Sequence, residues 1–393
     1  MSGTEGALAG VHILDLTDER GIYGAKLLAD MGADVVRPEP TDGDPLRLRG
    51  PHRKGAAPGA TSLWHTFFAS NRRFFAVDPA TDEGREQLGR LVERSDIVLT
   101  CGDSFGTAAV DLDAERERRP QLVVVDTTSF GPDGPWRDFL APDLVAGALG
   151  GACATTGDVD TPPLKAFGEL NFMVAGAYIA IAALGALYRA RQTDVGQRVD
   201  VPVHECIASC LEQVHMWTWY GDALPHATAP SLPRRGSLHW SNAYVVMQAR
   251  GGSIMITPAP DPQALILWLV QEDAHEDLLD EKWTEPENLL AFTGRLMELT
   301  RKWVATKDVE ELFFEAQSRH CPFGWVLPIE KVAQNPQLEA RQWWIPYRTG
   351  TTETRGPGAP YRFSETPCQL GPYGEPGADS DAILAEIGWE DAS

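Results

Sequence analysis

Short runs of apolar residues recur along the first half of the chain, and segments with helical periodicity separate them. The runs are too short for helices and end at Asp, Gly or Pro, which is typical of buried strands in a parallel sheet. The segments between them predict helices, for example at 21–33 and 81–95, where Thr81 and the acids after it form a helix start. Strands that alternate with helices indicate βαβ units, so the first half predicts an open α/β sheet with ligands at the carboxyl ends of its strands. The predicted strands are residues 11–17, 34–39, 74–79, 95–100 and 121–131.

The pattern changes beyond residue 240. A hairpin at 244–257 and two amphipathic helices predict a smaller α+β domain over residues 241–330. The stretch 221–240 is rich in Pro, Gly and Ala and predicts a linker. Residues 1–220 then form the large α/β domain, and residues 331–393 complete it. The predicted fold class is therefore α/β, with a large open parallel sheet and a smaller α+β domain.

One segment stands apart because it is made of small apolar residues. GELNFMVAGAY, residues 168–178, continues into a helix that runs to about residue 190. Small residues let another element approach a helix closely, while Glu169 and Asn171 lie at its mouth. Residues 172–188 are nearly long enough to span a bilayer, but they are rich in Ala and Gly and are flanked by acids. We therefore predict a buried central helix with a polar site at its start.

Composition restricts the classes of partner. The chain has 393 residues and a net charge of −22, which argues against nucleic acid and anionic membranes because both attract basic surfaces. A small anionic ligand needs only a few local arginines. The six cysteines form no CxxC pair, and the first ten residues do not resemble a signal peptide, so we expect a reducing, cytoplasmic setting. The sequence has no metal-ligand spacing, no GxGxxG fingerprint after the first strand and no P-loop, so no metal, dinucleotide or ATP site is expected.

Several stretches, taken in order, resemble the class III CoA-transferases, also called the CaiB/BaiF or formyl-CoA-transferase family. The resemblance covers nearly the whole chain, and no single motif would carry it alone. The stretches are VHILDLT to GDPLR (11–47), SNRRFFAVDP to SDIVL (70–99), SFGPDGPW to ALGG (129–151), ALYRARQTDVGQRVDVPVHE (186–205), CPFGWVLPIEKVAQNPQLEARQWW (321–344) and FSETP to AEIG (363–388).

The resemblance implies both a fold and a reaction. In the family a large and a small domain are joined by long linkers, and two chains interlock, so an interlocked dimer is expected here. The reaction moves CoA from an acyl-CoA to a carboxylic acid. An aspartate carboxylate attacks the donor thioester and forms a mixed anhydride, which the released CoA thiolate opens to an aspartyl-CoA thioester. The acceptor acid then repeats these steps in reverse. No permanently bound cofactor or metal is implied, and the coenzyme A thioester is a substrate.

The family nucleophile has no carboxylate counterpart in this chain. Counting back from Gly196 and Gln197 places it at Asn171, or at Phe172 if one gap is allowed. Neither side chain can form the acyl intermediate, although Asn171 has nearly the shape of aspartate. Some family members are heteromeric, as in the benzylsuccinate type, with one aspartate-bearing subunit and one degenerate subunit. We therefore predict the degenerate subunit of a CoA-transferase that uses an acyl-CoA such as succinyl-CoA and an organic acid, with an aspartate-bearing paralogue as its partner.

The resemblance also suggests where CoA would bind. Arg37, at the end of the second strand, is a candidate contact for a CoA phosphate, with a surface ion pair to Glu39 as the alternative. Arg72 and Arg73 are candidates for the adenosine phosphate, with a solvated turn as the alternative. The loop at 101–106 carries an acid where phosphate would lie, which disfavours CoA binding.

Two other interpretations stay open. In the first, the chain is a self-sufficient homodimeric transferase, and Glu169 supplies the carboxylate. A structural alternative for Glu169 is stabilisation of the positively polarised helix N-terminus. In the second, the chain is a non-catalytic protein that binds an acyl-CoA or an acid on the same fold. Asp143 is a further acid nearby, which we interpret as structural, as a helix cap.

Overall fold

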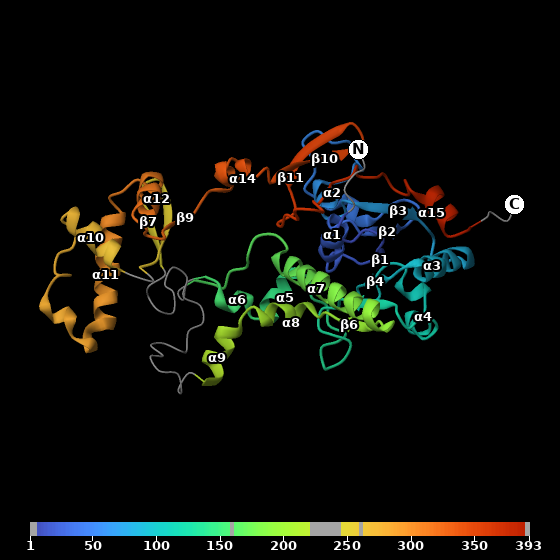
Figure 1. The fold of residues 1–393 in the computed structure, drawn as a ribbon, viewed down its shortest axis with the longest axis horizontal. Helices are drawn as coiled ribbons and strands as arrows, with labels where there is room; N and C mark the ends of the chain where they lie inside the picture. Colours follow the sequence, from blue (N-terminus) through green and yellow to red (C-terminus); the bar gives the residue numbers. More distant parts are fainter. Residues whose placement is uncertain (1–5, 158–160, 221–244, 259–261, 390–393) are drawn as a thin grey trace. The chain divides into compact units, whose positions relative to one another are not determined.

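The structure of the protein is a computed structural model in which the chain divides into two units (Figure 1). It describes residues 6–157, 161–220, 245–258 and 262–389. Unit 1 comprises residues 1–150, 166–210 and 336–393, and unit 2 comprises residues 151–165 and 211–335. The predicted linker at 221–240 lies outside the described residues.

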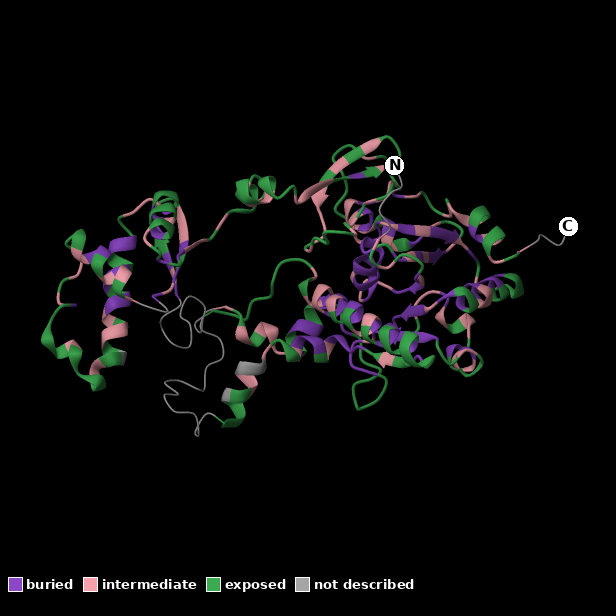
Figure 2. Ribbon diagram, viewed as in Figure 1, coloured by how far each residue is buried: buried purple, intermediate pink, exposed green. Residues whose placement is uncertain are grey.

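Unit 1 contains the open parallel sheet that the apolar runs predict. Its six strands lie in the order β3-β2-β1-β4-β5-β6, and every neighbouring pair is parallel. The order reverses between β1 and β4, and crevices at such a point bind ligands in open α/β sheets. Figure 2 shows that much of this sheet is buried. The strands are β1 (His12–Leu16), β2 (Asp34–Glu39), β3 (Arg72–Ala76), β4 (Ile97–Thr100), β5 (Val123–Asp126) and β6 (Arg198–Asp200).

Helices cover both faces of the sheet because strand side chains alternate between them. Leu14 and Leu16 of β1 point to the face where α3, α4 and α15 pack, in one core cluster with Leu88 and Ile383. On the other face α7 packs against α1 and β5. The helices of unit 1 are α1 (Ile22–Asp30), α2 (Leu63–Phe68), α3 (Asp82–Arg94), α4 (Leu112–Arg118), α5 (Asp143–Leu149), α7 (Leu170–Thr193), α8 (Val203–Ser209), α14 (Pro336–Ala340) and α15 (Ser380–Glu386), with two 3-10 turns, η1 (Pro45–Leu48) and η2 (Thr107–Ala109).

The small residues of α7 allow the close approach that the sequence predicts. A Cβ atom on Gly24 of α1 would lie 2.7 Å from Ile179, and one on Gly176 would lie 2.9 Å from the Gly24 nitrogen. The helix is apolar and long enough to cross a membrane by length and composition, but it buries one face in unit 1. Its other face exposes Ile181 and Tyr188.

The last part of the chain returns to the sheet and covers the edge strand β3. The Phe74 amide donates to Asp379, the Asp379 amide donates to the Phe74 carbonyl, and the Ala76 amide donates to Ser380. These bonds occupy backbone groups that an open edge would leave unpaired. An antiparallel hairpin that the sequence analysis did not predict, β10 (Trp344–Thr349) with β11 (Thr352–Pro357), also belongs to unit 1.

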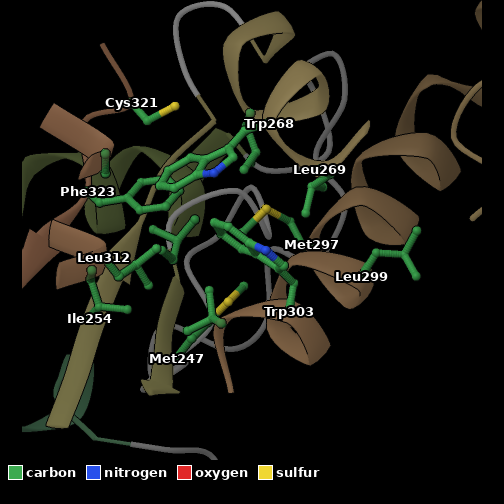
Figure 3. Packing of buried hydrophobic residues seen from close by; sticks show 14 of the residues in the cluster. Met247, Ile254, Trp268, Leu269, Met297, Leu299, Trp303, Leu312, Cys321 and Phe323 are labelled. Atoms are coloured by element: carbon green, nitrogen blue, oxygen red, sulfur yellow. The ribbon is translucent and has the colours of Figure 1, made fainter. Parts of the chain in front are cut away.

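Unit 2 is a smaller α+β body with an antiparallel sheet in the order β7-β8-β9. It also includes residues 151–165 and 211–220, which the sequence assigned to the large domain. Trp268 and Trp303 form an edge-to-face pair at 4.7 Å in its core, beside Phe323 (Figure 3). Residues 203–220 form two helices, because α8 ends at Ser209 and α9 begins at Glu212. The elements of unit 2 are α6 (Ala152–Thr155), α9 (Glu212–Tyr220), β7 (Val245–Ala249), β8 (Gly252–Ile256), α10 (Gln263–Gln271), two 3-10 turns at Glu281–Thr284 and Pro286–Asn288, α11 (Leu289–Val304), α12 (Val309–Ser318), β9 (Gly324–Trp325) and α13 (Ile329–Ala333).

Candidate functional site at the start of helix α7

Asn171 lies in the first turn of α7 and is bonded to Asp143 at the start of α5. Its side-chain Nδ2 donates to Asp143 Oδ2 at 2.9 Å and to the Asp143 carbonyl at 3.1 Å. The Phe172 amide donates to the other carboxylate oxygen, Oδ1, at 3.0 Å. Asp143 therefore caps α7, a helix 28 residues further along the chain, and its charge lies at the positively polarised end.

An amide at residue 171 suits this geometry. The atom that meets the Asp143 carboxylate must donate a hydrogen bond, and asparagine can donate where an ionised aspartate cannot. The approach is close, since a Cβ atom on Gly147 of α5 would lie 2.6 Å from Asn171 Nδ2. Phe172, the other position counted for the nucleophile, is buried. The two candidate positions thus hold a hydrogen-bond donor and a buried ring.

Glu169 immediately precedes α7 and is held by two side chains that come more than 100 residues earlier in the chain. Its Oε1 pairs with the Arg49 guanidinium, and its Oε2 accepts from Trp64 Nε1 at 3.0 Å. Arg49 also lies 5.0 Å from the centre of the Trp64 ring and 3.7 Å from Glu19. The Glu169 side chain is 17% exposed and makes no cap hydrogen bond to α7. Glu169 can therefore stabilise the start of α7 only through its charge, because its side-chain hydrogen bonds are made with Arg49 and Trp64.

Arg37 and Arg72 lie in the interior and share one carboxylate. Both guanidiniums lie 3.1 Å from Asp15 Oδ2, and Arg37 also pairs with Asp44 at 2.6 Å. Burial alone would raise the pKa of Asp15, but the two guanidiniums and Thr17 outweigh it and lower that pKa. The alternative for Arg37, a surface ion pair with Glu39, is wrong, because Arg37 turns inward to Asp15 and Asp44.

These groups belong to what we call the buried charge cluster. It contains three carboxylates, three arginines and one histidine, so its formal charges balance when the histidine is neutral. Glu39 holds Arg47 through both carboxylate oxygens, at 2.8 and 3.0 Å. Burial lowers the pKa of His65 to about 4, which keeps this side chain neutral at pH 7. The members are Asp15, Glu39, Asp44, Arg37, Arg47, Arg72 and His65.

Arg73 points away from Arg72, because neighbouring strand residues face opposite sides of a sheet. It pairs with Glu386 of α15 at 2.7 Å and with Asp34 at 3.3 Å. The alternative of a solvated turn for this pair is wrong, since both residues lie in β3 and Arg72 is buried. The structure therefore does not bring the three candidate CoA contacts to one site. That they bind CoA stays a prediction, and their present ion pairs do not favour it.

The crevice at the reversal of strand order is occupied by the protein's own groups. Arg20 pairs with Asp18 and donates to the Cys101 carbonyl at 2.8 Å, which joins the loops after β1 and β4. Ser104 donates to the Leu16 carbonyl beside it. A cavity of about 210 Å³ adjoins these loops, and its charged lining comprises Asp15, Asp18, Glu19, Asp44 and Arg37. Four carboxylates against one guanidinium disfavour a ligand with several phosphates.

Sequence reasoning did not single out Arg20, Arg49 or Trp64. Arg20 follows two acids, Asp18 and Glu19, and Arg49 follows the Gly-Asp-Pro turn. No local signal marks Arg49 and Trp64, because their partner Glu169 is 120 and 105 residues away. Among the described residues no group of three or more His, Cys, Asp or Glu side chains could hold a metal ion.

The comparisons with known proteins agree with this fold and with the order of segments. The model of CoA-transferase family III matches residues 8–381. This chain belongs to that family. A formyl-CoA:oxalate CoA-transferase of Streptomyces avermitilis is 29% identical over 93% of this chain and 91% of its own length. The BbsE subunit of the succinyl-CoA:(R)-benzylsuccinate CoA-transferase of Thauera aromatica is 30% identical over 96% of this chain and 93% of its own length.

A solved structure shows the same fold. The CaiB/BaiF family protein from Brucella suis superposes with a TM-score of 0.82 at 24% identity, covering 98% of this chain and all of that one. Family membership supports chemistry on CoA thioesters in general. It makes the start of α7, where the resemblance places the nucleophile, the candidate active site of this chain.

Proposed function

We propose that this chain is the nucleophile-lacking subunit of a heteromeric CoA-transferase that moves CoA from an acyl-CoA such as succinyl-CoA to an organic acid. The observation that carries the proposal is the bonding of Asn171. Its amide donates to Asp143, so the position needs a donor and does not supply an attacking carboxylate. The likeness to a subunit of a two-component transferase supports the same conclusion.

The chemistry requires the missing carboxylate to come from another chain. CoA can be held as a thioester only by an acyl group, so an amide nitrogen or a phenyl ring cannot replace the aspartate. An aspartate-bearing paralogue would supply it in an interlocked dimer in the cytoplasm. Exposed apolar side chains on α5 and α7, among them Leu144, Leu149, Ile181 and Tyr188, favour a partner over this face because such patches are costly in water.

Self-sufficiency through Glu169 is the first alternative. The ion pair with Arg49 and the hydrogen bond from Trp64 stabilise the ionised carboxylate, which reduces its nucleophilicity. A binding role without catalysis is the second alternative. The four carboxylates that line the cavity beside β1 disfavour whole CoA and an anionic acid alike, so this cavity does not support it.

The test is intact-mass spectrometry of the purified chain after incubation with a panel of acyl-CoAs. It is done alone and with a co-expressed aspartate-bearing paralogue, with borohydride or hydroxylamine trapping. We expect no adduct on this chain, and a trapped acyl or CoA adduct on the paralogue. An adduct on this chain alone that disappears in Glu169→Gln would contradict the proposal and establish the self-sufficient enzyme. Failure to co-purify with any paralogue, together with no adduct, would favour the binding protein.

A further inference from the structure

Arg49 and Trp64 form a small set of donors that matches a carboxylate. A guanidinium presents parallel N–H groups that fit two carboxylate oxygens, and an indole presents one N–H donor. Here the guanidinium lies over the Trp64 ring, and both side chains donate to the same acid, one to each oxygen of Glu169. Trp64 is itself held by Phe68, whose ring centre lies 4.6 Å away.

The Glu169 carboxylate, which accepts from Arg49 and Trp64, is not required for α7 to form. Glu169 makes no cap hydrogen bond, so α7 can start without its side chain. Arg49 is 37% exposed, and ion pairs open to solvent contribute little to stability. Glu19, from the loop after β1, approaches the same guanidinium from 3.7 Å. The contact therefore lies beside the carboxyl end of β1, where open α/β sheets bind their ligands.

We propose that Arg49 and Trp64 are a binding site for the carboxylate of a small organic acid and that Glu169 is its built-in competitor. In the free chain the Glu169 carboxylate occupies the donors, and an incoming acid displaces it. The identity of that acid as the acceptor substrate rests on the proposed function, whereas the site itself rests on the geometry of these three residues.

The competition between Glu169 and a free acid can be measured as a change in the apparent affinity for that acid. A tethered carboxylate acts at a high effective concentration, so it weakens the apparent affinity for a free acid. If the Arg49–Glu169 pair contributes what exposed ion pairs usually do, its removal should tighten binding about fivefold.

The experiment uses the full-length chain, free of partner and CoA, with sodium acetate and sodium succinate as probes. Binding is followed by the indole N–H resonance of Trp64 in ¹⁵N-tryptophan-labelled protein, and the resonance is assigned by its loss in Trp64→Phe. Glu169→Ala should lower the apparent Kd for acetate about fivefold. Glu169→Gln keeps the shape of the side chain, so its apparent Kd for acetate should lie between those of Glu169→Ala and the natural chain.

Two controls make the result specific. Glu19→Gln removes a charge near the Arg49 guanidinium but leaves Glu169 bonded to it. The affinity for acetate should therefore rise less than about twofold. Arg49→Gln in the Glu169→Ala background should abolish the shift of the Trp64 resonance. An affinity for Glu169→Ala equal to that of the natural chain, or an equal gain in Glu19→Gln, would overturn the inference. Because no partner is present, that outcome would leave partner-dependent CoA transfer, and so the proposed function, unaffected.

Discussion

Two of the pairings of arginine with carboxylate in unit 1 differ mainly in their access to water. In the buried charge cluster the side chains of Arg37 and Asp15 are 4% and 0% exposed, whereas those of Arg49 and Glu169 are 37% and 17% exposed. The buried pair stabilises one arrangement of the sheet, because separating its members would leave a charge without water or a partner. The pair at the mouth of α7 can exchange partners, because solvent compensates each charge. Residue type alone does not distinguish a structural arginine from a ligand-binding arginine.

The difference between the two pairs is tested most directly by removing Asp15, the carboxylate that Arg37 and Arg72 share. Asp15→Asn should lower the free energy of unfolding by about 3–5 kcal/mol, because Arg37 and Arg72 would lose the charge between them in the interior. Urea denaturation at pH 7 measures it. Arg73→Ala, at a partly exposed pair, is the control and should cost about 1 kcal/mol or less. Equal losses would show that the cluster is open to solvent and available to a ligand.

The histidine of the cluster gives a dependence on pH. Its pKa is lowered by burial to about 4 from an ordinary value of about 6.5, so the unfolded chain binds the proton first as pH falls. The stability that a neutral His65 contributes is present above about pH 6.5 and is lost as pH falls towards 4. By pH 4.5 the loss should reach roughly 2–3 kcal/mol.

The matched variant is His65→Gln, which keeps a polar side chain that does not titrate. We expect the difference in unfolding free energy between pH 7 and pH 4.5 to shrink in this variant by the amount given above. An unchanged pH dependence would mean that carboxylates elsewhere in the chain account for the acid sensitivity.

The position of the mouth depends on how closely α7 approaches α1. Gly176→Ala should cost about 2 kcal/mol, because its Cβ atom would lie 2.9 Å from the backbone nitrogen of Gly24. Gly185→Ala in the same helix is the control, since nothing lies within 4 Å of its added Cβ atom, and it should be neutral or stabilise by up to about 1 kcal/mol. The difference between the two thermal midpoints is the readout. If both substitutions behaved alike, close packing would not position α7.

The smallest change in the free energy of unfolding is expected at Asn171, in the first turn of α7. Asn171→Asp places a second carboxylate 2.9 Å from Asp143 Oδ2 and should cost about 1–2 kcal/mol at pH 7. Like charges raise the pKa of the pair, so the cost should fall as pH is lowered and one proton is shared. Urea midpoints at pH 7 and pH 5 test this. A variant as stable as the natural chain at both values would show that Asp143 is not the constraint that selects asparagine.

The strands were predictable where burial is complete on both faces. β4 and β5 each have three consecutive apolar residues before a polar last residue, and all their residues are buried. β3 was predicted to begin at residue 74, but it begins at Arg72. The charge of Arg72 interrupts the apolar pattern of this strand. Its burial could not be predicted, because its partner Asp15 is distant in sequence. The β10–β11 hairpin was missed for a related reason, since its mixed sequence with Pro346 shows no clear alternation.

The candidate site was predictable only in part. The small-residue helix with Glu169 and Asn171 at its start is visible in the sequence, because these residues are neighbours. Their partners are not visible, since Asp143, Arg49 and Trp64 come from other elements. The burial of Arg37 and Arg72 was also not predictable, because a guanidinium is placed inside only when the fold brings carboxylates to it.

The return of the final residues to the edge of β3 has a consequence for how the chain is made. Unit 1 is interrupted by residues 211–335, and the groups that cover its edge strand arrive with Asp379 and Ser380. During synthesis the ribosome must therefore produce all of unit 2 before the sheet edge is covered, and at typical rates this takes roughly ten seconds or more. A nascent chain would display an unpaired strand for that period. Its yield in the cell should accordingly depend on translation speed and on chaperones that shield exposed strands.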